Sequence, residues 1–113
     1  MVGYHYHVKF SDGTIQLGRP HEMVGAHCEN FNKNSIGIAL SGEHFFSQLQ
    51  FDSLFMLCKN LINDYDLCVS DIYGHNELNP HKTCPNFNVE AFRKCLDLNR
   101  NPMKVDMMLG KDF

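Results

Sequence analysis

The feature that most restricts the fold of this chain is one segment of regular apolar spacing between residues 51 and 65. Apolar side chains recur there mostly every three or four residues, at Phe51, Leu54, Cys58, Leu61, Ile62 and Tyr65. This spacing predicts an amphipathic α-helix, because it places the apolar side chains on one helical face. Ser47 and Gln50 have the residue types and the spacing of a capping box, so we expect the helix to start near Ser47.

Four shorter segments have the composition of β-strands. Residues 4–10 are rich in aromatic side chains and end at a Ser-Asp-Gly turn signal, after which residues 14–18 can return as the second strand of a hairpin. Residues 35–41 have the pattern of a buried strand, in which Gly37 marks a close backbone approach. Residues 67–73 follow the helix and are predicted to form a further apolar strand.

The sequence also predicts a second helix and a long loop. The helix is expected to start after Asn88, a residue type that favours the N-cap, with Val89, Phe92 and Leu96 facing inward. Residues 19–34 lack periodicity and contain a proline, a glycine and three asparagines. We therefore expect a long ordered loop there, and loops of that length are often functional.

Length and composition indicate one soluble domain. The 113 residues have room for a single core, which we assign to residues 1–100, followed by an irregular tail at residues 101–113. A formal net charge of -3 with ten Lys and Arg leaves no basic stripe for nucleic acid. Short apolar runs and an N-terminus without a signal-peptide pattern predict synthesis in the cytoplasm and no membrane insertion. Five cysteines without paired spacing are expected to be reduced thiols.

Residues 74–85 carry the clearest chemical signal. His75 and Cys84 are both residue types that ligate zinc, and Lys82 brings a cation close to Cys84. The two donors are nine positions apart, too far for one helical face, but two prolines in the segment make the chain turn and can bring them together. Catalytic zinc usually takes three protein ligands and leaves a fourth position to water, so this loop would supply two of the three.

Four segments of the chain, taken together, form a further pattern. They are Val2-Gly3-Tyr4-His5-Tyr6, Gly25-Ala26-His27 followed by Asn32, Asn34-Ser35-Ile36-Gly37-Ile38, and Gly74-His75 through Lys82-Thr83-Cys84-Pro85. In order and approximate spacing they resemble zinc-dependent N-acetylmuramoyl-L-alanine amidases, the family of the amidase-type bacteriophage lysozymes and the peptidoglycan recognition proteins. The resemblance runs from residue 2 to about residue 97. It implies an α/β (α+β) fold with a mixed central sheet flanked by helices.

The resemblance also implies roles for the matching residues. His75 and Cys84 match the second and third zinc ligands of the family. Lys82 matches a cation that stabilises charge on the substrate carbonyl, and Tyr4 matches a tyrosine whose hydroxyl lies beside the water on the metal. His81 is an additional residue between the proline and the lysine of the motif.

The chain also departs from the family pattern. In the family, the first zinc ligand is a histidine at the end of an N-terminal strand, which a helix follows, and both precede the first of the four segments. We therefore expect this chain to lack that strand, that helix and that ligand. Strand alternation would turn His5 and His7 away from a cleft that Tyr4 faces. His27 and His81 are then the hypothetical substitutes for the missing ligand.

The implied function is a peptidoglycan hydrolase that cleaves the amide between N-acetylmuramic acid and L-alanine with zinc-activated water. Such a protein would be a phage or prophage endolysin acting on the bacterial cell wall, and His27 and Asn32 match the loop that lines its glycopeptide cleft. The alternative is a non-catalytic amidase-like protein that binds wall fragments or a protein partner, because the first zinc ligand is missing. The sheet edge left open by the missing strand predicts a dimer or a docked partner.

Overall fold

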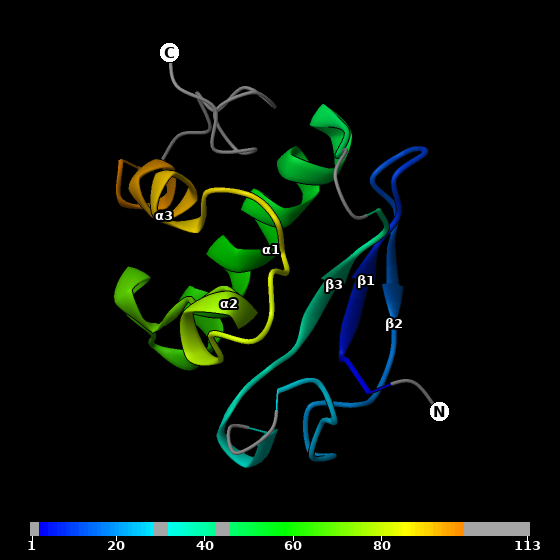
Figure 1. Cartoon of the computed structure of the whole chain (residues 1–113), viewed down its shortest axis with the longest axis vertical. Helices are drawn as coiled ribbons and strands as arrows, with labels where there is room; N and C mark the ends of the chain where they lie inside the picture. The colour runs from blue at the N-terminus through cyan, green and yellow to red at the C-terminus, as the bar shows by residue number, and fades with distance from the viewer. Residues whose placement is uncertain (1–2, 29–31, 43–45, 99–113) are drawn as a thin grey trace.

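The computed structural model describes residues 3–28, 32–42 and 46–98. Within these ranges the chain forms a small sheet, at the right of Figure 1, and three α-helices at the centre and the left. A mixed sheet flanked by helices confirms the predicted α/β (α+β) fold class. The tail expected at residues 101–113 lies outside the described residues.

The sheet is built from three short strands in the described part of the chain. They are β1 (Tyr6–Val8), β2 (Ile15–Leu17) and β3 (Ile38–Leu40). Their order is β2-β1-β3, with β1 antiparallel to β2 and parallel to β3. The predicted hairpin and the predicted strand around residue 38 are therefore both confirmed, although each strand is shorter than the sequence pattern suggested.

The hairpin turn is held by local hydrogen bonds. Lys9 N–H donates to the Thr14 carbonyl at 2.9 Å, and Gly13 N–H donates to the Lys9 carbonyl at 2.9 Å. The Asp12 carboxylate accepts the N–H of Thr14 at 2.9 Å. Gly13 has a φ of 72°, and a Cβ there would lie 2.5 Å from the Leu49 carbonyl oxygen, so both the turn and the adjacent helix require glycine.

Helix α1 (Gln48–Tyr65) is the predicted amphipathic helix. Ser47 is its N-cap, and both hydrogen bonds of the predicted capping box with Gln50 are present. Gln50 is 0% exposed, and its Nε2 donates to the carbonyl oxygens of Val8 at 3.0 Å and Ser41 at 2.9 Å. This one side chain ties the helix to β1 and to the residue after β3.

Helix α3 (Val89–Asp97) starts where the sequence predicted. The Oδ1 of its N-cap Asn88 accepts the N–H of Ala91 at 3.0 Å. The core between α1 and α3 is rich in aromatic rings, whose neighbouring centroids lie 5.4 to 6.5 Å apart: Phe46, Phe51, Phe87 and Phe92. Among the described helices, none is long and apolar enough to cross a bilayer.

The prediction of a strand at residues 67–73 is wrong. The segment contains a 3-10 turn, η2 (Val69–Asp71), and the one-turn helix α2 (His75–Leu78) follows it. The Asp71 carboxylate accepts the N–H of Cys68 at 2.8 Å, and such a local bond competes with strand pairing. Cys68 is exposed, so the apolar composition of the segment does not reflect burial in a sheet. The candidate zinc loop therefore follows a turn on the helical side of the molecule.

Candidate functional site

The segment that carries His75 and Cys84 folds back on itself. His75 is the first residue of α2, and the next amide, Asn76 N–H, donates to the Cys84 carbonyl at 2.8 Å. Between them, Lys82 N–H donates to the Asn79 carbonyl at 3.0 Å. As a result, His75 Nδ1 lies 3.4 Å from Cys84 Sγ. The fold thus brings together two side chains that are nine positions apart in the sequence.

This separation fits a shared zinc ion. Zinc lies about 2.3 Å from a thiolate sulfur and about 2.0 to 2.1 Å from an imidazole nitrogen, so a tetrahedral angle between the two bonds puts sulfur and nitrogen about 3.6 Å apart. The observed 3.4 Å is close to that value, and it also suits a hydrogen bond between a thiol and an imidazole. Among the residues that the structure describes, no third His, Cys, Asp or Glu joins the pair in a group that could hold a metal.

The loop before β3 brings His27 to the same region. The 3-10 turn η1 (Asn32–Asn34) follows this loop, and Asn32 Oδ1 accepts the N–H of His27 at 2.8 Å and of Cys28 at 2.9 Å. His27 Nε2 lies 3.3 Å from Ser35 Oγ. A Cβ at Gly37 would lie 2.5 Å from the His27 ring, so the backbone passes close to the imidazole. The close approach predicted at Gly37 is therefore confirmed.

The two loops are coupled electrostatically. Burial lowers the pKa of His27, and the nearby His5 and His75 imidazoles lower it further. Burial raises the pKa of the Cys28 thiol, and the charge of Cys84 raises it further. His27 and Cys28 therefore lie within electrostatic reach of the two candidate zinc ligands. Sequence reasoning missed Cys28, because the spacing of the cysteines does not show that the fold brings it within electrostatic reach of Cys84.

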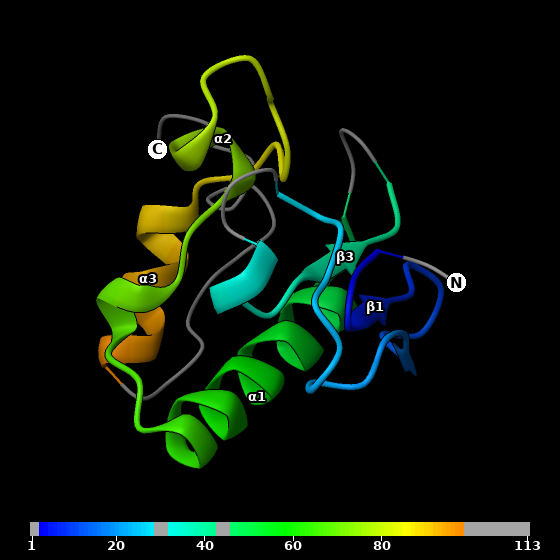
Figure 2. The ribbon, with the colours of Figure 1, turned by 90° about the horizontal axis from the view of Figure 1, so that it is seen from below.

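Most of the predicted site residues line one cavity of about 1310 Å³ between β3 and the helices. Figure 2 shows α2 and α3 on one side of this region and β3 on the other. The polar side chains of the lining include Tyr4, His27, Cys28, His75, His81, Lys82 and Cys84. Ile38 and Leu40 from β3 also contribute to it, as does Phe92 from α3. Asn32 is not part of this lining, and its side-chain oxygen instead bonds to the backbone of the loop that carries His27.

Tyr4 lines the cavity, whereas His5 and His7 do not, in agreement with the prediction that both histidines turn away from it. β1 itself begins only at Tyr6, so Tyr4 lies before the strand. The Tyr4 ring lies 5.6 Å from that of His7. Tyr6 instead bonds through its hydroxyl to His21, and His21 bonds to Tyr65. Tyr4 is thus the tyrosine of this segment that lines the cavity, while Tyr6 joins β1 to the end of α1.

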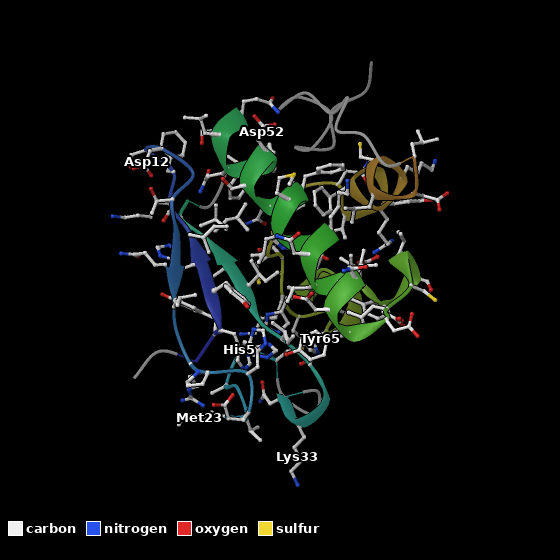
Figure 3. The ribbon with its side chains drawn as sticks, turned by 180° about the vertical axis from the view of Figure 1, so that it is seen from behind. His5, Asp12, Met23, Lys33, Asp52 and Tyr65 are labelled. Carbon is white, nitrogen blue, oxygen red and sulfur yellow. The ribbon has the colours of Figure 1, made fainter. Side chains whose placement is uncertain are left out.

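His5 has a structural position that sequence reasoning missed. It is 2% exposed, its Nδ1 accepts the N–H of Gly37 at 3.0 Å, and its Nε2 lies 2.9 Å from the Met23 carbonyl oxygen. Because Nδ1 accepts a hydrogen bond, Nε2 carries the proton and donates it to Met23. Figure 3 shows His5 and Met23 toward the end of the molecule that bears Lys33. Aromatic and imidazole residues alternate in this segment, so no sequence signal distinguished the buried histidine from its neighbours.

Comparisons with known proteins agree with these features. A family model described as N-acetylmuramoyl-L-alanine amidase matches residues 1–87. Over 99 residues the chain is 36% identical to the endolysin of Escherichia phage T7 and 35% identical to that of Enterobacteria phage T3, which covers 80% of this chain and 63% of each relative. The amidase LysC from Clostridium intestinale URNW is similar with a TM-score of 0.74 and 33% identity, over 88% of this chain and 66% of that chain.

The sheet order, the flanking helices and the structural similarity define an amidase-like fold. Since the family model matches more than half of the sequence, the chain belongs to the N-acetylmuramoyl-L-alanine amidase family. It spans 63% of the length of the two phage endolysins.

Proposed function

We propose that this chain is a peptidoglycan hydrolase of a phage or prophage endolysin, which cleaves the amide between N-acetylmuramic acid and L-alanine at the bacterial cell wall. Family membership and the similarity to two endolysins support the reaction class. The observation that carries the proposal is the 3.4 Å separation of His75 Nδ1 and Cys84 Sγ on the wall of the cavity. We assign the activity to a domain of residues 1–100.

The residues around the cavity have complementary roles in this proposal. His75 and Cys84 would hold Zn²⁺, with Cys84 as the thiolate. When bound, zinc supplies a nucleophile at neutral pH, because it lowers the pKa of water from about 15.7 to about 7. Lys82 would stabilise negative charge on the carbonyl oxygen, a role worth about 3 to 4 kcal/mol for a well-placed donor. Tyr4 would orient the water or the leaving group.

The loop of His27 completes the proposed substrate cleft. His27 lines the cavity and would contact the glycopeptide, whereas Asn32 would act by holding the loop through its two backbone contacts. Catalytic zinc usually takes three protein ligands, and His27 and His81 are the hypothetical candidates for the third. Neither forms a three-donor group with His75 and Cys84 in this structure, so either imidazole would have to move toward the pair to complete the site. A zinc titration of His27→Ala that showed unchanged affinity would exclude His27.

The alternative function is binding of wall fragments or of a protein partner without catalysis. It is favoured by the absence of a three-donor group among the described residues. β2 is an edge strand of the described sheet and bears Leu17, which is 82% exposed, so a second copy of the chain or another partner could pair there. Light scattering at high micromolar concentration would then give the mass of a dimer, and a monodisperse monomer would exclude self-association.

Metal content and hydrolysis, measured on the same preparations, test the proposed function. The amidase proposal expects close to one zinc per chain, together with release of stem peptides from purified peptidoglycan that a chelator abolishes. His75→Ala and Cys84→Ser should lose both. Cys68→Ser is the matched control, because Cys68 is an exposed thiol outside the cavity lining. A zinc-free chain that binds peptidoglycan without cleaving it would support the alternative.

A further inference from the structure

The helix that carries His75 is too short to be stable alone. α2 has four residues, and a single helical turn is not stable in water because its nucleation is unfavourable. Contacts with the rest of the molecule must therefore set its orientation. The side-chain contacts of α2 that the structure describes include a bidentate ion pair with α3, between Glu77 and Arg93.

This ion pair reaches both the start of α2 and the backbone before it. Arg93 Nη1 and Nη2 donate to Glu77 Oε1 and Oε2, each at 2.8 Å. Glu77 Oε1 also accepts the N–H of Gly74, the N-cap of α2, at 2.7 Å. Arg93 Nη1 donates as well to the Ile72 carbonyl at 2.8 Å. One guanidinium thus holds the segment that leads into α2 and the carboxylate that caps it.

Helix α3 is a firm support for this guanidinium. Asn88 caps its first turn, and Phe92, the neighbour of Arg93, is 1% exposed in the aromatic core. The Arg93 and Glu77 side chains are themselves 21% and 34% exposed. A partly exposed pair of this kind contributes little to global stability, so the loss of the pair should act mainly on α2.

We propose that Arg93 and Glu77 are positioning residues, which hold α2 so that His75 and Cys84 stay within reach of one metal ion. This inference rests on the proposed function. The contacts form a continuous path, since the ion pair fixes the first turn of α2, His75 begins that turn, and Asn76 N–H donates to the Cys84 carbonyl. Without the pair, α2 and the Cys84 turn would move relative to each other.

Variants of the ion pair test this role through two independent measurements. The first is affinity for Co²⁺, followed by the absorption band of the cobalt–thiolate bond, and the second is hydrogen exchange of the Asn76 amide. Arg93→Gln should weaken Co²⁺ binding about tenfold, as expected for groups that orient metal ligands, and should speed Asn76 exchange about tenfold. Glu77→Gln should act in the same direction.

Two further variants separate geometry from charge. Arg93→Lys keeps the positive charge but loses the bidentate geometry, so it should give an intermediate affinity and restore only part of the Asn76 protection. Lys94→Gln removes an exposed cation from the next position of α3 and should match the wild type in both measurements.

The outcomes distinguish this inference from the proposed function. Wild-type Co²⁺ affinity and wild-type Asn76 exchange in Arg93→Gln would overturn the positioning role. Faster exchange at Leu57, in the middle of α1, to the same extent as at Asn76 would also overturn it, because the effect would then be a general loss of stability. If the wild type binds no Co²⁺, the metal site of the proposed function fails, and Asn76 exchange alone decides whether the pair positions α2.

Discussion

At the scale of single residues, His5 and Cys58 show how burial decides chemistry in this protein. His5 is 2% exposed and hydrogen-bonds through both ring nitrogens, so it acts as a bridge between the segment before β1, the long loop and the start of β3. Cys58 is 5% exposed and packs in the core. Cys58 is part of the cavity lining and His5 is not, and the proposed function gives neither of them a chemical role. The effect of each on the protein can be measured directly.

His5→Ala should be strongly destabilising. It leaves the Gly37 N–H and the Met23 carbonyl without their partner and removes a buried ring, so we expect the free energy of unfolding to fall by about 3 kcal/mol. Urea denaturation followed by circular dichroism measures this loss. His81→Ala, at an exposed histidine, should change stability by less than about 0.5 kcal/mol. Equal stabilities of the two variants would contradict a bridging role for His5.

Cys58 should be chemically inert in the folded protein. Burial raises its pKa to about 12, and the thiolate is the reactive form, so iodoacetamide at pH 8 should leave it unmodified. Cys68 is exposed and should react under the same conditions. Peptide mass spectrometry after short labelling distinguishes the two sites. Labelling of Cys58 at the rate of Cys68 without denaturant would show that the described packing of α1 is wrong.

At the scale of elements, α1 organises the molecule because it makes specific polar contacts as well as apolar ones. Ser47 and Gln50 cap its first turn, and Gln50 extends from that turn to the sheet. The segment after α1 behaves differently, since a bond between Asp71 and Cys68 replaces strand pairing. Local polar contacts thus decide both where this helix starts and which structure the next segment adopts.

Gln50→Leu should uncouple α1 from the sheet. The substitution keeps the approximate volume but leaves the Val8 and Ser41 carbonyls and the Ser47 N–H without their partner, so a loss of about 2 to 3 kcal/mol in unfolding free energy is expected. Chemical denaturation measures it, with Asn60→Leu on the exposed face of α1 as the control. A Gln50→Leu protein as stable as this control would rule out a tethering role.

At the scale of the whole molecule, the cavity is formed by the packing of separate segments of the chain. Its lining comes from the loop before β3, from β3, from α1 and from the segment of α2 and Cys84, which are distant in the sequence. The same packing brings the imidazoles of His5 and His75 close enough to lower the pKa of His27. The pKa of His27 therefore depends on residues from other segments of the chain.

Stability should depend on pH through His27. Its folded pKa lies below 6.5, so the unfolded chain binds more protons, and the stability present above pH 6.5 is lost as the pH falls through the folded pKa. His27→Asn removes this contribution, so wild type and variant should differ more at pH 7.5 than at pH 5. Urea denaturation at both values measures it, and His81→Asn is the control. An unchanged pH dependence in His27→Asn would contradict the coupling.

Several features were predictable because each depends on residues close together in the chain. The apolar period of α1, its capping box, the hairpin turn and the Asn88 cap all belong to this class. The strand predicted at residues 67–73 is wrong because that prediction used the apolar composition alone. It did not include the hydrogen bond from the Cys68 N–H to the Asp71 carboxylate, which competes with strand pairing. The first strand is also shorter than its aromatic pattern suggested, because β1 starts two residues after Tyr4.

The sequence by itself determined most of the local elements, the family pattern and, as an expectation, the pairing of His75 with Cys84. Only the tertiary structure decided that their reactive atoms lie 3.4 Å apart, that Cys28 lies within electrostatic reach of Cys84, and that Arg93 holds Glu77 across sixteen positions. The physical reason is the separation along the chain over which each interaction acts. Helix periods, caps and turns act over a few residues, whereas contacts between separate elements depend on how their surfaces pack, and no local pattern specifies that packing.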